Sequence, residues 1–177
     1  MAGIATPGLL TTSTSTVSLF SPSLNLSSVL GSALLYDIVP LGKLHADKTT
    51  YNALRLHGLL VTNVTDHEEA LDLLHRDCER AVDVVVLHLR SPRQLDLALQ
   101  FMAEAVELKL PRQVVFIGLL GGSDVVRLDA ACDQLVSYGV RWCARLPPAP
   151  EVLDAVVALA SKHSGLVPRA RPPPAFS

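Results

Sequence analysis

The sequence predicts an α/β fold of three layers, in which helices cover both faces of a five-stranded parallel sheet of order 2-1-3-4-5. Short apolar runs alternate with amphipathic segments, which is the pattern of a parallel sheet with both faces covered. Apolar residues make up 49% of the chain and aromatic residues only 5%, as suits a sheet of aliphatic residues beneath helices. Right-handed crossovers leave few strand orders, and this one is common for five strands.

Five short apolar runs are predicted to be the strands, namely residues 34–39, 59–64, 83–89, 114–119 and 140–144. The third run is the most informative. It reads Asp-Val-Val-Val-Leu-His-Leu and carries a polar side chain, His88, towards its end. In open parallel sheets the functional crevice lies at the carboxyl ends of the strands, so we expect His88 to lie in it.

The first two helices are expected from their ends. A helix over residues 47–57 is closed by Gly58, because glycine adopts the left-handed conformation that ends many helices. Asp66 and Glu69 have the spacing of a capping box, in which the aspartate accepts from a backbone N–H and the glutamate reaches back. This box predicts the start of the second helix.

The other three helices are expected from similar signals. Ser91 followed by Pro92 is a strong helix start, Ser123 is expected to cap the fourth helix, Gly139 to close it, and Pro150 to open the last helix. The expected buried stripes are Leu71 and Leu74 in the second helix, Leu95, Leu99, Met102 and Val106 in the third, and Leu128, Cys132 and Leu135 in the fourth.

The chain is expected to hold one domain between two tails. Residues 1–30 are rich in Ser and Thr and are expected to form a flexible segment. Residues 31–164 form the predicted α/β domain, and residues 165–177, with three consecutive prolines, are expected to be a tail.

Charge and cysteine content narrow the function classes. The formal net charge is -2, so neither nucleic acid nor an anionic membrane is an expected partner. No apolar run is long enough to span a bilayer, and three cysteines without a pairing motif argue for reduced thiols. We expect a cytoplasmic protein.

On these residues the chain resembles the receiver-like family of two-component signalling over about residues 33–162, which implies a flavodoxin-like fold. The resemblance implies an acidic pair after strand one to hold Mg²⁺, an acceptor aspartate after strand three, a Ser or Thr after strand four and a lysine before a proline after strand five. This sequence departs from that pattern at nearly every position. The corresponding residues are Asp37 alone, His88, Gly118 and Leu146, followed by a matching Pro147.

A second resemblance covers a shorter stretch. Residues 90–96, Arg-Ser-Pro-Arg-Gln-Leu-Asp, are similar to the receiver-like module of the eighth family of cyclic-nucleotide phosphodiesterases, and the similarity continues through Lys109-Leu110 and residues 114–118. Such modules are regulatory. The family has an aspartate where this chain has His88.

The expected function is therefore that of a non-catalytic pseudo-receiver, a regulatory or protein-interaction module in intracellular signalling, possessing no enzymatic activity, metal or cofactor. The partner is expected to be another protein or a second copy of the chain. Receivers often bind partners through the fourth helix, fifth strand and fifth helix, which makes Arg141, Trp142 and Arg145 the candidate contact residues.

The alternative function is that of a cobalamin-binding-like domain, which shares this architecture. Such a domain resembles this one but carries an Asp-x-His-x-x-Gly loop after strand one, with the histidine on cobalt. Here His45 stands at the ligand position, Lys43 replaces the aspartate that would orient it, and Lys48 replaces the glycine. The ligand loop is thus degenerate.

Overall fold

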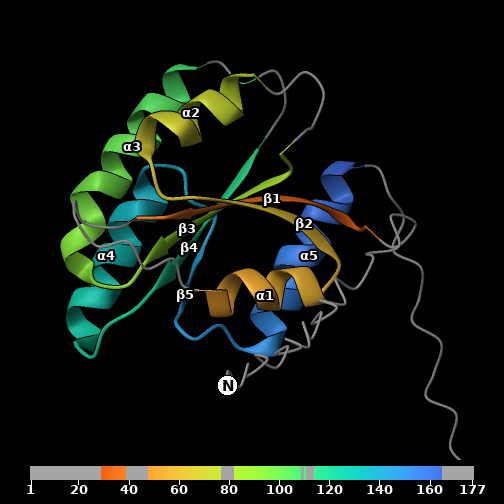
Figure 1. Ribbon diagram of the computed structural model, residues 1–177. Coiled ribbons are helices and arrows are strands. Elements are labelled where there is room, and N and C mark those ends of the chain that lie inside the picture. Colours follow the sequence, from red (N-terminus) through yellow and green to blue (C-terminus); the bar gives the residue numbers. More distant parts are fainter. Residues whose placement is uncertain (1–28, 39–47, 77–81, 109, 111–113, 165–177) are drawn as a thin grey trace, which may run out of the picture.

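The predicted sheet is present in the computed structural model, which describes residues 29–38, 48–76, 82–108, 110 and 114–164. The strands are β1 Gly31–Asp37, β2 Leu59–Val64, β3 Val84–Leu89, β4 Val115–Leu120 and β5 Cys143–Arg145. All four neighbouring pairs are parallel, and their order is β2-β1-β3-β4-β5. The fold class predicted from the sequence is confirmed (Figure 1).

The helices that cover the sheet are α1 Lys48–Leu56, α2 His67–His75, α3 Leu95–Glu107, α4 Val125–Ser137 and α5 Pro150–Ser164. Gly58 and Gly139 end α1 and α4 with φ values of 91° and 103°, which L side chains rarely adopt. Asp66 caps α2 by accepting from the Glu69 backbone N–H at 2.9 Å. Glycine and aspartate therefore act as the sequence predicts.

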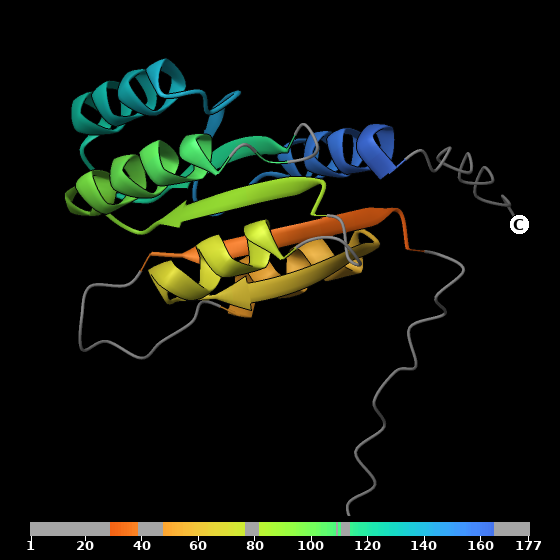
Figure 2. The same ribbon diagram turned by 90° about the horizontal axis from the view of Figure 1, so that it is seen from above.

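Helices lie on both faces of the sheet and bury two separate apolar clusters (Figures 1 and 2). Helices α2, α3 and α4 cover one face, which contributes Leu34, Val85 and Leu87 to its cluster. Helices α1 and α5 cover the other, where Val84 and Val86 are buried. Every residue of β3 is buried, because the central strand has helices on both sides.

Three local predictions are wrong. Helix α4 is capped by Asp124, which accepts from the Arg127 backbone N–H, and not by Ser123. In α3 the side chain of Val106 is 66% exposed, and Ala98 and Ala105 are buried on the face towards the sheet. Strand β5 begins at Cys143 rather than residue 140, although the Arg141 backbone N–H already donates to the Phe116 carbonyl of β4 at 2.8 Å.

Candidate functional site

The carboxyl ends of β1 and β3 bring Asp37 and His88 together. The two residues are direct partners in the parallel register, and residues paired in this way project from the same face of a sheet. Both side chains are 1% exposed. They lie on the face covered by α1, because the His88 ring meets Thr50 of that helix. His88 therefore lies at the carboxyl edge of the sheet as expected, but it is buried there, and its place in a functional crevice stays a prediction.

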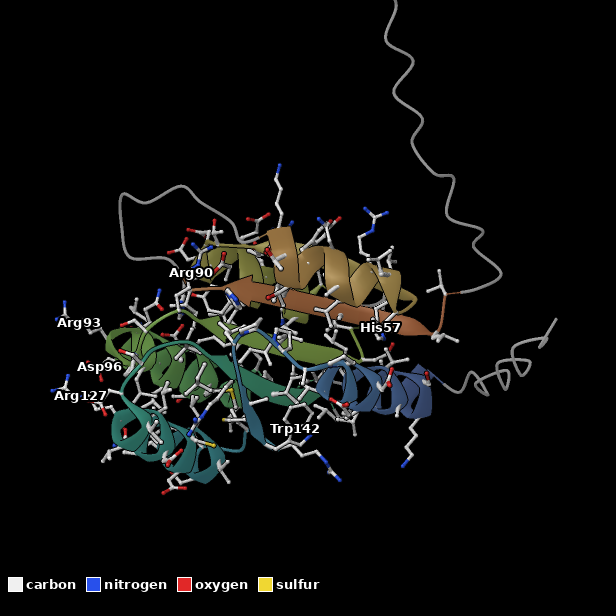
Figure 3. All side chains as sticks on the ribbon, turned by 90° about the horizontal axis from the view of Figure 1, so that it is seen from below. His57, Arg90, Arg93, Asp96, Arg127 and Trp142 are labelled. Atoms are coloured by element: carbon white, nitrogen blue, oxygen red, sulfur yellow. The ribbon has the colours of Figure 1, made fainter. Side chains whose placement is uncertain are left out.

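Both carboxylate oxygens of Asp37 are engaged by the protein itself. Oδ1 lies 2.9 Å from Nδ1 of His88, and Oδ2 accepts from Nη2 of Arg90 at 2.8 Å. The Arg90 side chain is 38% exposed, so one member of this group reaches solvent (Figure 3). Hydrogen bonds in which at least one partner is charged are about twice as strong as neutral ones.

The contacts also fix how His88 is oriented. Carboxylate oxygens accept hydrogen bonds, so Nδ1 of His88 carries the proton that it donates to Asp37. The other ring nitrogen, Nε2, lies 3.5 Å from the Thr50 hydroxyl. The guanidinium of Arg90 carries the positive charge that faces the carboxylate of Asp37. Thr50, His88, Asp37 and Arg90 thus form one hydrogen-bonded group, the Asp37 network.

The turn after β3 closes over the end of β1. Ser91 caps it by accepting from the Arg93 backbone N–H, and the Ser91 backbone N–H donates to Gln94 Oε1 at 3.0 Å. Gln94 is buried, and its amide nitrogen donates to the Ile38 carbonyl. The Ile38 backbone N–H in turn donates to the His88 carbonyl at 3.1 Å. This turn therefore holds Arg90 beside Asp37.

The other predicted pocket residues, Gly118, Leu146 and Pro147, are not part of the Asp37 network. Gly118 is paired with Leu87, one residue before His88, and faces α4, because a Cβ built on it would come 2.8 Å from Cys143 Sγ and 3.5 Å from Leu135 Cδ1. The prediction that Gly118 shares the pocket is therefore wrong. Leu146 is half-buried on the α1 and α5 side, and Pro147 is exposed.

The predicted contact residues lie on the edge strand. Arg141 and Arg145 are exposed, and Arg145 reaches Asp129 of α4 at 3.5 Å. Trp142 is half-buried and packs against the cluster beneath α5 (Figure 3). Their role in binding stays a prediction. His45 of the alternative cobalamin loop lies outside the described residues.

Sequence reasoning missed Thr50, Arg90 and Gln94 as members of the site. Arg90 follows His88 by two residues, a spacing that keeps side chains on the same side of an extended strand. That spacing is the signal that could have found it. The sequence holds no such signal for Thr50, because the position of this residue depends on how α1 packs on the sheet.

The arrangement leaves little for a cation to bind. Mg²⁺ takes several hard oxygen ligands in an octahedron, whereas the oxygens of Asp37 are hydrogen-bonded to an imidazole and a guanidinium. Across the part of the chain that the structure describes, no three His, Cys, Asp or Glu side chains gather as metal ligands. In the same part, each helix is too short or too polar to cross a membrane.

The order of the five strands and the placement of the helices define a receiver-like, flavodoxin-like α/β fold. A crystal structure of a response regulator receiver protein from Burkholderia phymatum is similar to this chain, with a TM-score of 0.51 and 18% sequence identity. The match covers 73% of this chain and 97% of the other. At this identity the likeness concerns the fold. No protein-family model and no curated protein matches the sequence.

Proposed function

We propose that this domain is a pseudo-receiver, a regulatory module of intracellular signalling that neither binds Mg²⁺ nor accepts a phosphoryl group at the carboxyl edge of its sheet. The observation that carries the proposal is the state of Asp37, whose two carboxylate oxygens are taken by His88 and Arg90 while the side chain is buried. The domain then acts through its surface.

The free energy needed to break the Asp37 network supports this proposal. For Mg²⁺ to bind Asp37, the contacts to Arg90 and His88 must first be given up. Separating a buried ion pair costs about 3–5 kcal/mol, which corresponds to roughly two to almost four orders of magnitude in affinity. Repulsion between the cation and Arg90 adds to this cost. A divalent ion at ordinary cellular concentration would therefore leave the site empty.

The residues around His88 also argue against transfer of a phosphoryl group. The charge that develops on such a group needs neutralising by a metal ion and a cationic side chain. Leu146 stands where the resemblance to receivers implies a lysine. Nδ1 of His88 is bonded to Asp37, and Nε2 faces Thr50 beneath α1, so neither nitrogen is open to a phosphodonor.

Intact mass spectrometry tests the non-catalytic part of the proposal. The folded protein is incubated with Mg²⁺ and a small acyl phosphate donor, beside a working receiver that shows the donor to be active. The proposal predicts no adduct on this chain, and none on a His88→Asp variant, since that change restores the acceptor alone. An adduct at Asp37 or His88 of the unaltered protein would overturn it.

The proposed interaction face comprises α4, β5 and α5. Besides Arg141 and Arg145, it exposes apolar side chains on α4, where Val126 is 78% and Val125 is 47% exposed. Arginine is enriched at protein contact surfaces, and apolar side chains exposed together mark interaction sites. The partner is either another signalling protein or a second copy of this chain.

A pair of matched substitutions tests this face. Val126→Asp places a charge on α4, and Leu56→Asp does the same at the end of α1, where the leucine is 87% exposed. Self-association by sedimentation, and affinity for any identified partner, should fall by about tenfold or more with the first change. The second change should leave both unaltered, and equal effects of the two changes would refute the assignment of the face.

We infer the cyclic-nucleotide setting from the phosphodiesterase-like segment at residues 90–96. The structure gives this segment a local role, since it contains the partner of Asp37 and the Ser91 cap of the turn. Sequencing the transcript tests the kinship. A reading frame that continues into a PAS-like region and a helical hydrolase domain would support it, and a different domain following this one would contradict it.

A further inference from the structure

Two thiols meet in a small cavity between α4 and β5. Cys132 of α4 and Cys143 of β5 both line a cavity of about 110 Å³ whose walls also include Leu120, Leu128 and Ala144. Both cysteines are free and half-buried. The Arg145–Asp129 contact of 3.5 Å spans the same two elements beside them. The cavity thus combines an apolar wall, a charged rim and two thiols.

The sequence explains why the Cys143 sulfur points towards α4. Cys143 is paired with Gly118 of β4, and a Cβ at Gly118 would come within 2.8 Å of Sγ. The missing side chain makes room for the sulfur above the sheet, and Cys143 packs with Leu128 and Leu135 of α4. Cys132 lies on the same helix and opens into the same space.

The electrostatics show that the two thiols interact. Burial first, and then the neighbouring Cys132 side chain, raise the pKa of the Cys143 thiol well above its ordinary value. Cys143 therefore stays protonated at neutral pH, and we assign the role of attacking nucleophile to Cys132. Since the thiolate is the reactive form, the roles of the two cysteines differ.

We propose that Cys132 and Cys143 form a reversible two-thiol oxidation site, whose substrates are small hydroperoxides and which closes to a disulfide between α4 and β5. The thiolate of Cys132 attacks one peroxide oxygen and the O–O bond breaks. Cys132 becomes a sulfenic acid, and the other oxygen takes up a proton and leaves as water or as an alcohol. The Cys143 thiol then attacks the Cys132 sulfur, forms the S–S bond and releases water. Two thiols lose two electrons and two protons, and the peroxide is reduced.

The disulfide would tie α4 to the edge of the sheet at the centre of the proposed interaction face. The oxidation chemistry involves neither Asp37 nor His88, whereas its expected effect on binding rests on the proposed interaction face. Helix α4 would move less in the disulfide form than in the dithiol form. This helix exposes Val125 and Val126. Oxidation is thus expected to alter self-association or partner binding.

The test uses the full chain with Cys78, which lies outside the described residues, changed to serine. The folded protein is treated with dilute hydrogen peroxide and its intact mass is measured. We expect a loss of two hydrogen atoms, reversal by a thiol reductant, and a cross-linked peptide pair that contains Cys132 and Cys143. Cys132→Ser and Cys143→Ser variants are expected to lack this loss. Should the Cys78→Ser chain not fold, the same peptide mapping is done on the unaltered protein.

A comparison with the unfolded chain separates a built site from chance reactivity. In a glutathione buffer the ratio of disulfide to dithiol should be at least about tenfold higher in the folded protein than in guanidinium chloride. An equal or lower ratio would overturn the proposal, because an unfolded chain would then pair the thiols as well. Oxygen addition at either cysteine of the folded protein without a cross-link would overturn it too.

Discussion

Replacing Arg90 by glutamine removes the guanidinium that contacts Asp37 and leaves His88 in place. The lost contact is a hydrogen bond of 2.8 Å between charged groups, with the carboxylate buried. Such bonds contribute about 1.5–3 kcal/mol, and stranding one member of a buried pair costs about 3–5 kcal/mol. Because Arg90 is 38% exposed and glutamine can still donate, we expect a loss of about 2–3 kcal/mol.

Urea unfolding at neutral pH measures this loss against a matched control. Arg93 lies three residues further along the same turn and is exposed, so Arg93→Gln should change the free energy of unfolding by less than about 0.5 kcal/mol. A double-mutant cycle with Asp37→Asn should give a coupling energy of at least about 1 kcal/mol. If Arg90→Gln costs no more than the control, the argument for a self-neutralised carboxylate is wrong.

Three further predictions concern other parts of the fold. Burial raises the pKa of Tyr36 to about 12, so stability should decline from about pH 10 to 12 as the unfolded chain loses that proton first, and Tyr36→Phe should flatten this decline in alkaline urea titrations. A hydrogen bond from His67 lowers the pKa of Glu104, so this pair stabilises the fold at neutral pH and the stabilisation is lost in acid. In urea unfolding at several pH values, Glu104→Gln should therefore lose less stability than the unaltered protein as the pH falls. Gly118→Ala should cost about 1–3 kcal/mol through its contact with the Cys143 sulfur, and Cys143→Ala in the same chain should restore most of it; no recovery would refute the packing argument.

The sequence predicted the sheet because its signals are local and repeated. An aliphatic run followed by a cap or a glycine occurs at the second, third and fourth strands, and α1 and α4 are closed by Gly58 and Gly139 as expected. The meeting of Asp37 and His88 followed from strand order alone. Strands one and three are neighbours in this topology, so their carboxyl ends must lie together.

The partner of Asp37 could not be identified in the same way. Asp37 and Arg90 are separated by 53 residues along the chain, and their contact depends on the register of two strands. Register is also why Gly118 was misplaced, since a shift of one residue moves a side chain to the opposite face. The prediction placed Gly118 from its position along β4 alone. Its pairing with Leu87 decides which face of the sheet it lies on.

The buried face of α3 was misjudged for a different reason. Large apolar residues at helical spacing favoured Val106, but the helix turns Ala98 and Ala105 towards the sheet. Small side chains allow a helix to lie close to strands, and the space beside them is filled by Phe101 and Met102. A prediction based on hydrophobicity gives little weight to alanine, although packing gives it much.

The most direct test of the central claim is a titration of the isotopically labelled protein with Mg²⁺ and beryllofluoride, followed by amide NMR. The account predicts no saturable shift for the amides of Asp37, His88 or Arg90, because the protein's own side chains already hold both oxygens of the carboxylate. Saturable shifts of these three amides at millimolar Mg²⁺ would contradict it.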